Sequence, residues 1–438
     1  MRYTKYKLKR GGKDKKRGKL IKLFIALALV GFVLYLAASS LVARPDIGNL
    51  KELSYLPAHK SINLMLRNFG SVKNVSIKVL QGEKELTLYS SKPQNGTISF
   101  RIDTKSMDLK DGKAKVLVDI RYGLIGKRIY QVDALIDTVP PEVHTLSYTP
   151  LVIQGGTGAV KVKIKDGAYA YTYVGDDRYQ MYPLGNGEWF TLFPIRVDER
   201  PFATIKVVAF DEAGNSYSTH INCRIKEVRF RVDRIQLNDE FINNVIFPLL
   251  GEEGKGLTPI DAFKRVNEVW RERDVEKLRN IGSKSIAKKL WNGEFVQLKN
   301  SKVISTFGDI RYYLYNGQEV SNSRHMGYDF ASIENSPLQA SNDGMVVFTG
   351  SLGIYGNTVV IDHGFGLMSL YGHLSEILVK EGKFVKKGEI IGKTGKTGLA
   401  LGDHLHFGIL VHGVEVNPVE WLDKRWIVSR VDRVLVQE

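Results

Sequence analysis

The sequence has only one cysteine in 438 residues, so no disulfide can form within the chain. It has no H-E-x-x-H motif, which excludes a helix-borne zinc site with a glutamate as base. It also has no sustained heptad repeat, which excludes a long coiled coil. The fold must therefore depend on its hydrophobic cores, and roughly two to four domains are expected for a chain of this length.

Positive charge is concentrated at the N-terminus. The formal net charge is +16, and residues 1–22 hold eleven Lys/Arg against one Asp. The rest of the chain carries 52 Lys/Arg against 46 Asp/Glu. Because that part is only mildly basic, no nucleic-acid partner is expected.

A run of 21 uncharged residues, 23–43, follows the basic segment. It is long enough to cross a membrane, and the charge before it predicts a cytoplasmic N-terminus. We therefore expect a basic cytoplasmic tail at 1–22 and a single transmembrane helix at 23–43 in the inner (cytoplasmic) membrane. The remainder would be periplasmic. The alternative is a cleaved signal peptide, which the small residues at 37–39 would permit. The run exceeds the usual signal core of about 7–15 residues, which favours an anchor.

Two β-rich segments come next. Residues 46–136 contain short alternating stretches separated by polar turns, which predicts an all-β sandwich. Residues 137–230 open with D-T-V-P-P at 137–141 and carry D-E-A-G-N at 211–215 before a last strand. These features resemble bacterial immunoglobulin-like modules. Such modules could also bind other proteins of the cell envelope.

The pattern becomes helical at 237–296. Thr258 and Pro259 predict a helix start, as cap and first residue, and apolar residues follow at helical spacing from Ala262 to Trp270. A second short helix is expected around Ile286 to Trp291. The tail at 427–438 is predicted to be one more strand.

Six of the nine histidines lie between His325 and His412. From His404 the sequence reads H-L-H-F-G-I-L-V, which is typical of a strand. Its odd positions, Leu405 to Val411, would face a core, and His404 and His406 would share the other face. His325-x-x-x-Asp329 stands among turn-forming residues and predicts a loop or strand entry. Neutral imidazoles with one carboxylate are the ligand set of a catalytic zinc.

These motifs resemble the lysostaphin/LytM-type zinc metallo-endopeptidases, which cut peptidoglycan peptides. The resemblance covers residues 297–426 and includes five further segments, S-T-F-G-D (305–309), L-Q-A-S-N-D-G (338–344), Y-G-N-T-V-V-I-D-H-G (355–364), V-K-K-G-E-I-I-G (385–392) and V-N-P (416–418). It implies an antiparallel all-β zinc peptidase domain. By position, His325, Asp329 and His406 would bind Zn²⁺, and His373 and His404 would be catalytic.

The overall expectation is a multidomain, membrane-anchored zinc peptidase that acts on peptidoglycan. One of His373 and His404 would take a proton from water and the other would stabilise the oxyanion. The other histidines are expected to be structural, although His363 could line the site. Two alternatives remain: a non-hydrolytic wall-binding regulator or activator of another hydrolase, and an envelope scaffold.

The stretch 237–295 allows one more hypothesis, because it directly precedes the catalytic domain. It could cover the groove, with Asn280, Asn292 or Asn300 reaching the metal. Alternatively, its apolar residues pack as a spacer, which is the interpretation we favour.

Overall fold

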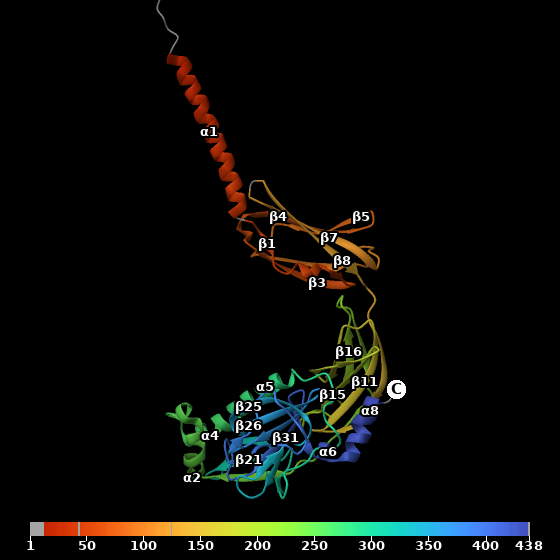
Figure 1. Cartoon of the computed structure of the whole chain (residues 1–438), viewed down its shortest axis with the longest axis vertical. Coiled ribbons are helices and arrows are strands. Elements are labelled where there is room, and N and C mark those ends of the chain that lie inside the picture. Colours follow the sequence, from red (N-terminus) through yellow and green to blue (C-terminus); the bar gives the residue numbers. More distant parts are fainter. Residues whose placement is uncertain (1–12, 43, 124, 437–438) are drawn as a thin grey trace, which may run out of the picture. The chain divides into compact units, whose positions relative to one another are not determined.

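The computed structural model describes residues 13–42, 44–123 and 125–436 (Figure 1). These residues form two compact units. The first extends to Val139 and includes Glu212–Asn215, and the second contains the rest of the chain from Pro140 onward. Each unit is described by itself.

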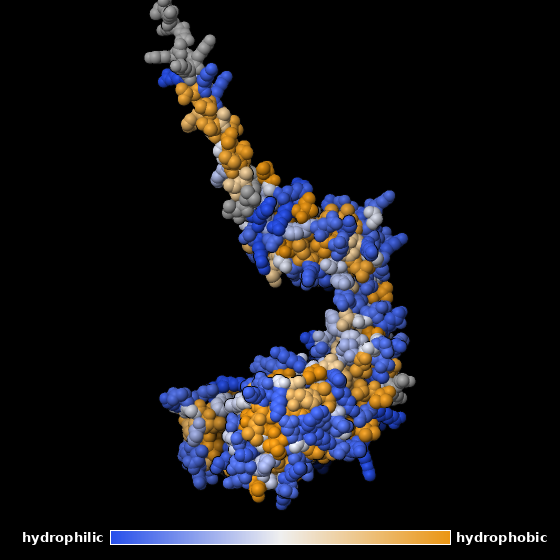
Figure 2. All heavy atoms as spheres, in the orientation of Figure 1, coloured by the Kyte–Doolittle hydropathy of each residue, from blue (hydrophilic) through white to orange (hydrophobic). Residues whose placement is uncertain are grey.

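Helix α1 (Lys13–Val42) is the apolar N-terminal element. Its segment Arg17–Ala38 is long and apolar enough to cross a membrane, and a signal sequence would share these properties. The apolar side chains along it are exposed (Figure 2). The helix begins before the uncharged run, so residues 13–22 of the expected tail are helical as well. Residues 1–12 of the expected tail, and residue 43, lie outside the described part.

The first β unit is a two-sheet structure that matches the segment expected at 46–136. One sheet has the order β1-β3-β6 and the other β2-β8-β7-β4-β5. Alternate residues of both sheets share one core, which includes Ile62, Leu64, Val75 and Ile77. The strands are β1 (Asp46–Ile47), β2 (Tyr55–Leu56), β3 (His59–Arg67), β4 (Val72–Gln81), β5 (Lys84–Ser91), β6 (Thr97–Asp103), β7 (Gly112–Tyr122) and β8 (Gly126–Ile136).

The second β segment has two sheets of four strands each, ordered β14-β15-β11-β9 and β13-β12-β16-β17, and a short parallel pair, β10-β18. Its strands are β9 (Glu142–Tyr148), β10 (Leu151–Ile153), β11 (Thr157–Lys165), β12 (Tyr169–Val174), β13 (Asp177–Gln180), β14 (Tyr182–Gly185), β15 (Glu188–Pro194), β16 (Ile205–Phe210), β17 (Ser216–His220) and β18 (Arg224–Lys226). This segment shares a core with the C-terminal domain, through Phe190 and Leu192 packed with Phe365 and Trp421.

The helical stretch follows a strand and ends at Gly282, earlier than the prediction. Strand β19 (Val232–Leu237) precedes it and pairs in parallel with β21 (Ile310–Tyr315). A first helical run contains α2 (Asp239–Phe241) and α3 (Phe247–Leu250). A second contains α4 (Pro259–Lys264) and α5 (Arg271–Gly282). Thr258 caps α4 by accepting a hydrogen bond from the Asp261 amide, with Pro259 at the first helical position, as predicted.

The second short helix expected around Ile286 to Trp291 was wrong. Residues 283–300 have no regular secondary structure, because they follow the edge of the C-terminal domain and bond to it. The Leu290 amide donates to the His363 carbonyl, and the Phe295 amide donates to the Trp421 carbonyl. Trp291 and Phe295 are buried in the core of that domain.

The C-terminal domain is built on an antiparallel sheet of eight strands, ordered β20-β23-β31-β27-β26-β25-β29 with β32 beside β31. Two smaller sheets flank it, β19-β21-β22 and β24-β30-β28. Its remaining strands are β20 (Lys302–Ser305), β22 (Gln318–Arg324), β23 (Tyr328–Ala331), β24 (Pro337–Gln339), β25 (Gly344–Leu352), β26 (Gly356–Gly364), β27 (Leu367–Gly372), β28 (Glu376–Ile377), β29 (Phe384–Val385), β30 (Ile390–Lys393), β31 (Leu405–Val411) and β32 (Val414–Val416).

Each face of this sheet has its own core. Leu405, Phe407, Ile409 and Val411 lie in the core shared with Trp421, so the predicted alternation along β31 is confirmed. Residues of the helical stretch, including Phe263 and Leu278, share a second core with strands β25 to β27 and β31. The stretch is therefore part of the C-terminal folding unit.

The tail is helical, so the strand expected at 427–438 was wrong. After α6 (Pro418–Leu422), the chain forms α7 (Lys424–Ile427) and α8 (Arg433–Val436), and residues 437–438 lie outside the described part. Ile427, Val431 and Val434 are buried together. Their spacing of four and three residues suits one face of a helix, and this tertiary packing outweighs the β-propensity of the valines.

Candidate active site and metal centre

Two neighbouring strands position the predicted ligands. In the β23–β31 pair Asp329 stands directly opposite His406, and His325 lies just after the end of β22. All three residues are at most 7% exposed. The sequence motif H-x-x-x-D and the second histidine of H-x-H therefore meet at one point.

His325, Asp329 and His406 are called the triad, and their three potential ligand atoms form a small triangle. His325 Nε2 and His406 Nδ1 each lie 3.0 Å from Asp329 Oδ1, and the two nitrogens are 3.2 Å apart. A tetrahedral zinc with bonds of about 2.0–2.1 Å would hold its ligand atoms about 3.3 Å apart. The donor set, its spacing and its burial thus fit a zinc ion.

Hydrogen bonds orient His325 for this role. Its Nδ1 lies 2.8 Å from the Thr306 carbonyl, which can only accept, so Nδ1 carries the proton and Nε2 offers a lone pair. The buried carboxylate of Asp309 accepts from the Thr306 amide and hydroxyl, at 3.1 and 2.9 Å. This arrangement holds the carbonyl in place behind the ring.

The electrostatics of the triad suit a cation. Burial alone would raise the pKa of Asp329, but the positive charge and hydrogen bonds that His325 and His406 supply when they are protonated hold that pKa well below its ordinary value. Burial lowers the pKa of His406 to about 4, against the opposing effect of Asp329. His406 is therefore neutral near neutral pH, as a metal ligand must be.

The far side of the His406 ring is tightly enclosed. His406 Nε2 is buried and has no hydrogen-bond partner within the described residues. The backbone at Gly327 approaches so closely that a Cβ there would lie 2.6 Å from Cε1 and Nε2 of the ring. The Tyr355 ring lies at 5.2 Å, between centroids. The ring has little freedom to move away from the triad.

His373 and His404 lie side by side next to the triad, with ring centroids 4.7 Å apart. Each Nδ1 lies 2.8 Å from a carbonyl oxygen, that of Thr397 for His373 and that of Gly402 for His404. Both Nδ1 atoms therefore carry protons and both Nε2 atoms present lone pairs. His404 Nε2 lies 3.7 Å from Asp329 Oδ1.

Local structure fixes His373 in particular. It follows Gly372, which stands opposite His406 in the β27–β31 pair, and its backbone has φ of 64°, in the left-handed region. The His373 amide donates to the Tyr355 carbonyl, which stabilises that conformation. Burial, with the nearby His404 and His406, lowers the pKa of His373 to about 3.

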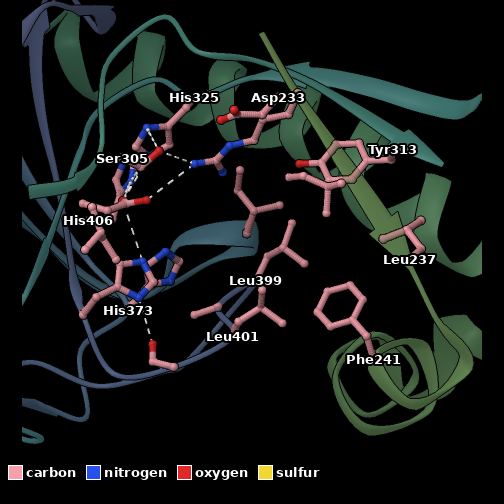
Figure 3. Close-up of a pocket in the computed structure, with 18 of the residues that line it drawn as sticks. Asp233, Leu237, Phe241, Ser305, Tyr313, His325, His373, Leu399, Leu401 and His406 are labelled. Atoms are coloured by element: carbon pink, nitrogen blue, oxygen red, sulfur yellow. Dashed lines mark hydrogen bonds and ion pairs between the residues drawn. The ribbon is translucent and has the colours of Figure 1, made fainter. Parts of the chain in front are cut away.

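A pocket of about 600 Å³ opens at the triad. Figure 3 shows His325, His373 and His406 on one side and Leu237, Phe241 and Tyr313 on the other, with Leu399 and Leu401 between them. The wall opposite the histidines thus comes from β19, α2 and β21. Sequence reasoning missed this wall and the pocket arginines Arg231, Arg271 and Arg311, although S-T-F-G-D had marked the segment just before Arg311.

The remaining histidines of the domain are structural, as predicted for His412. His363 is fully buried and is bonded to the Asp343 carbonyl and to Ser369, so it does not line the site. His412 is bonded to the Leu192 carbonyl and to Thr191. Asn280, Asn292 and Asn300 are not among the residues that line the triad pocket, so the hypothesis that one of them reaches the metal was wrong.

Comparison with known proteins agrees with this geometry. Residues 323–418 match the protein family described as "Peptidase family M23". The chain is 45% identical over 95 residues to the DD-carboxypeptidase/endopeptidase Mpg of Neisseria meningitidis, a match that covers 22% of each protein. It is 46% identical over 96 residues to the peptidoglycan DD-endopeptidase ShyA of Vibrio cholerae, again over 22% of each.

The chain thus spans about a fifth of the length of these curated relatives. Among solved structures, the catalytic domain of lysostaphin from Staphylococcus simulans is 30% identical, with a TM-score of 0.26, and the match covers 30% of this chain and 98% of that one. The matched residues contain His325, Asp329, His373, His404 and His406. The similarity to family M23 thus lies in residues 323–418, the part of the chain that carries the triad and the two neighbouring histidines.

Proposed function

We propose that this protein is a zinc metallo-endopeptidase that hydrolyses peptide cross-links of peptidoglycan. The observation that carries the proposal is the buried triangle of His325 Nε2, His406 Nδ1 and Asp329 Oδ1, with sides of 3.0, 3.0 and 3.2 Å. The names of the relatives, which include a peptidoglycan DD-endopeptidase, support the substrate class. His325, Asp329 and His406 would hold Zn²⁺.

In this proposal His373 and His404 move the protons. Zinc, when bound, would polarise the scissile carbonyl and lower the pKa of a coordinated water. With both Nδ1 atoms committed to carbonyls, each ring acts through Nε2. The Nε2 of one ring accepts the proton of the attacking water and returns it to the leaving amine nitrogen, while the other ring, in its imidazolium form, donates a hydrogen bond from Nε2 to the developing oxyanion.

The pocket suits an extended peptide. Leu237, Phe241 and Tyr313 can exclude water from one side of the bound chain while the histidines act on the other. Excluding water strengthens the electrostatic interactions on which the reaction depends. Residues before the M23 match thus complete the groove.

Elemental analysis and digestion of isolated peptidoglycan sacculi test this function together. We expect about one zinc per chain, because one group of three ligand side chains occurs among the described residues, and a catalytic zinc keeps its fourth position open. We also expect zinc-dependent release of soluble peptides. A zinc-loaded protein that releases nothing from sacculi, yet stimulates a second purified wall hydrolase, would instead show the regulator.

We also propose that α1 anchors the protein in the inner membrane with its N-terminus in the cytoplasm. The exposed apolar surface of α1 and the basic residues before it support this proposal. Membranes washed with carbonate should retain the protein, and protease added from the outer side should digest the residues after Arg44. A soluble product that begins near residue 40 would show that the segment is a signal peptide.

A further inference from the structure

The three arginines that line the pocket differ in their partners. Arg231 makes a two-pronged ion pair with Asp233, through Nε and Nη2 at 2.9 and 2.8 Å. Arg271 donates to the backbone and side-chain oxygens of Asn267, both at 3.1 Å, and acts electrostatically on the buried carboxyl of Glu415. Both guanidinium groups therefore have an acidic group nearby that does not belong to the triad.

Arg311 stands opposite Asp233 in the β19–β21 pair, but the Asp233 carboxylate is bonded to Arg231. The Nη2 of Arg311 donates to the hydroxyl of Ser305 at 2.6 Å, a neutral partner. Its ion-pair partner is Asp329, whose Oδ2 is 3.6 Å away, beyond hydrogen-bond length. The other oxygen of that carboxylate belongs to the triad, so a bound metal would take most of its charge. Arg311 would then keep a positive charge and free donors at the edge of the metal site.

The position of Arg311 limits what it can bind. Its guanidinium lies 3.6 Å from Oδ2 of the carboxylate that would hold the metal, so an anion bound to it would lie close to the scissile carbonyl. A carboxylate on the residue that supplies the scissile nitrogen is three bonds from the carbonyl carbon, or about 3–4 Å. The side chain is 23% exposed, so an ion pair here would be only weakly screened.

We propose that Arg311 binds a free carboxylate carried by the substrate residue that supplies the scissile nitrogen. This inference rests on the proposed peptidase function and narrows its substrate class. The bonds cleaved would be those whose amine-side residue is C-terminal, or is a diamino acid that keeps a carboxylate beside the bonded nitrogen. A planar guanidinium suits this role because it can form two parallel bonds to a carboxylate.

A purely structural role for Arg311 leads to different expectations. If it served only to orient Ser305 and Asp329, its loss would weaken zinc binding and slow the cleavage of every substrate by the same factor. As a carboxylate anchor, it would affect mainly those substrates that carry the carboxylate.

The test uses two synthetic cross-linked peptides that differ only in a carboxylate or a carboxamide on the residue supplying the scissile nitrogen. The zinc-loaded full-length protein should cleave the carboxylate peptide with a kcat/KM about 10- to 100-fold higher, the range for one charge-assisted hydrogen-bonded pair. Arg311→Gln should abolish this preference at unchanged zinc content, and Arg311→Lys should keep part of it. Arg231→Gln, the matched control in the same pocket, should keep the preference.

A second test measures, by calorimetry, how tightly zinc-loaded His373→Ala protein binds the same two peptides. It tests the carboxylate-binding role of Arg311 independently of the proposed peptidase activity. A preference for the carboxylate peptide that Arg311→Gln removes supports the subsite, even if the wild-type protein cleaves neither peptide and the peptidase proposal fails. Equal affinities for both peptides, or a uniform loss of rate with loss of zinc in Arg311→Gln, would overturn the proposal.

Discussion

Replacing Gly327 with alanine should disable the metal site without unfolding the protein. The new Cβ would lie 2.6 Å from two atoms of the His406 ring and 2.7 Å from the Phe407 carbonyl oxygen. Carbon contacts are normally about 3.5–4.0 Å, so the ring would have to move by roughly 1 Å. Metal–ligand distances tolerate only about 0.2 Å.

Neighbouring groups prevent an easy adjustment. The His406 ring faces His325 and Tyr355, with centroids at 5.0 and 5.2 Å, and its strand is paired on both sides. A displacement of about 1 Å at a catalytic group costs on the order of 100-fold in rate. Overpacking of this kind costs about 1–3 kcal/mol, which is less than the typical stability of about 5–15 kcal/mol.

The assay compares zinc affinity, thermal unfolding and peptide release for Gly327→Ala and for Gly408→Ala. Gly408 lies two residues after His406 on the same strand face, and a Cβ there would meet Leu370 Cβ at an ordinary 3.4 Å. We expect at least a 100-fold loss of activity with a folded protein for the first variant and nearly unchanged behaviour for the control. Normal zinc affinity and activity in Gly327→Ala would refute the steric argument.

Three further predictions follow from the same structure. His406→Ala should lose both zinc and activity, whereas His373→Ala should keep zinc and lose activity; loss of metal in His373→Ala would show by elemental analysis that the ligand assignment is wrong. Burial raises the pKa of Glu420 to about 8, above its ordinary value of 4.5. Between about pH 4.5 and 8 the folded protein therefore keeps a proton on Glu420 that the unfolded protein has lost, so the stability of the fold should fall as the pH rises through this range. Chemical denaturation of Glu420→Gln should show a shallower fall, and an unchanged pH profile would argue against that proton. A protein that begins at Gln297 lacks the buried Phe263, Leu278 and Trp291, and the loss of each such side chain costs about 2–5 kcal/mol. Circular dichroism and gel filtration should therefore show that this fragment is unfolded or aggregated. A folded, active fragment would contradict the shared core.

Local patterns sufficed for the centre of the site. The alternation along Leu405 to Val411 predicts the core face of β31 and the opposite face for His406, and both are observed. The cap at Thr258 is likewise local, because the hydroxyl and the Asp261 amide are three residues apart. Such features depend on neighbouring residues, so a single sequence contains the information.

The missed features depend on distant contacts. Strand β19 pairs in parallel with β21 across the intervening helices, and only Leu237 of its six residues is buried. The tail was predicted as a strand because valine favours strands, but helical packing of Ile427, Val431 and Val434 determines its structure. Arg311 gave no signal because its significance lies in its distance from Asp329.

The triad also has a mechanical consequence. Asp329 and His406 belong to the large sheet, whereas His325 lies at the end of β22, in the small sheet that contains β19 and β21. A metal ion held by all three would tie the two sheets together at one point. The outer wall of the groove, with Leu237 and Tyr313, belongs to that small sheet. Loading the metal would therefore clamp the wall against the catalytic sheet, and the width of the groove would depend on metal occupancy.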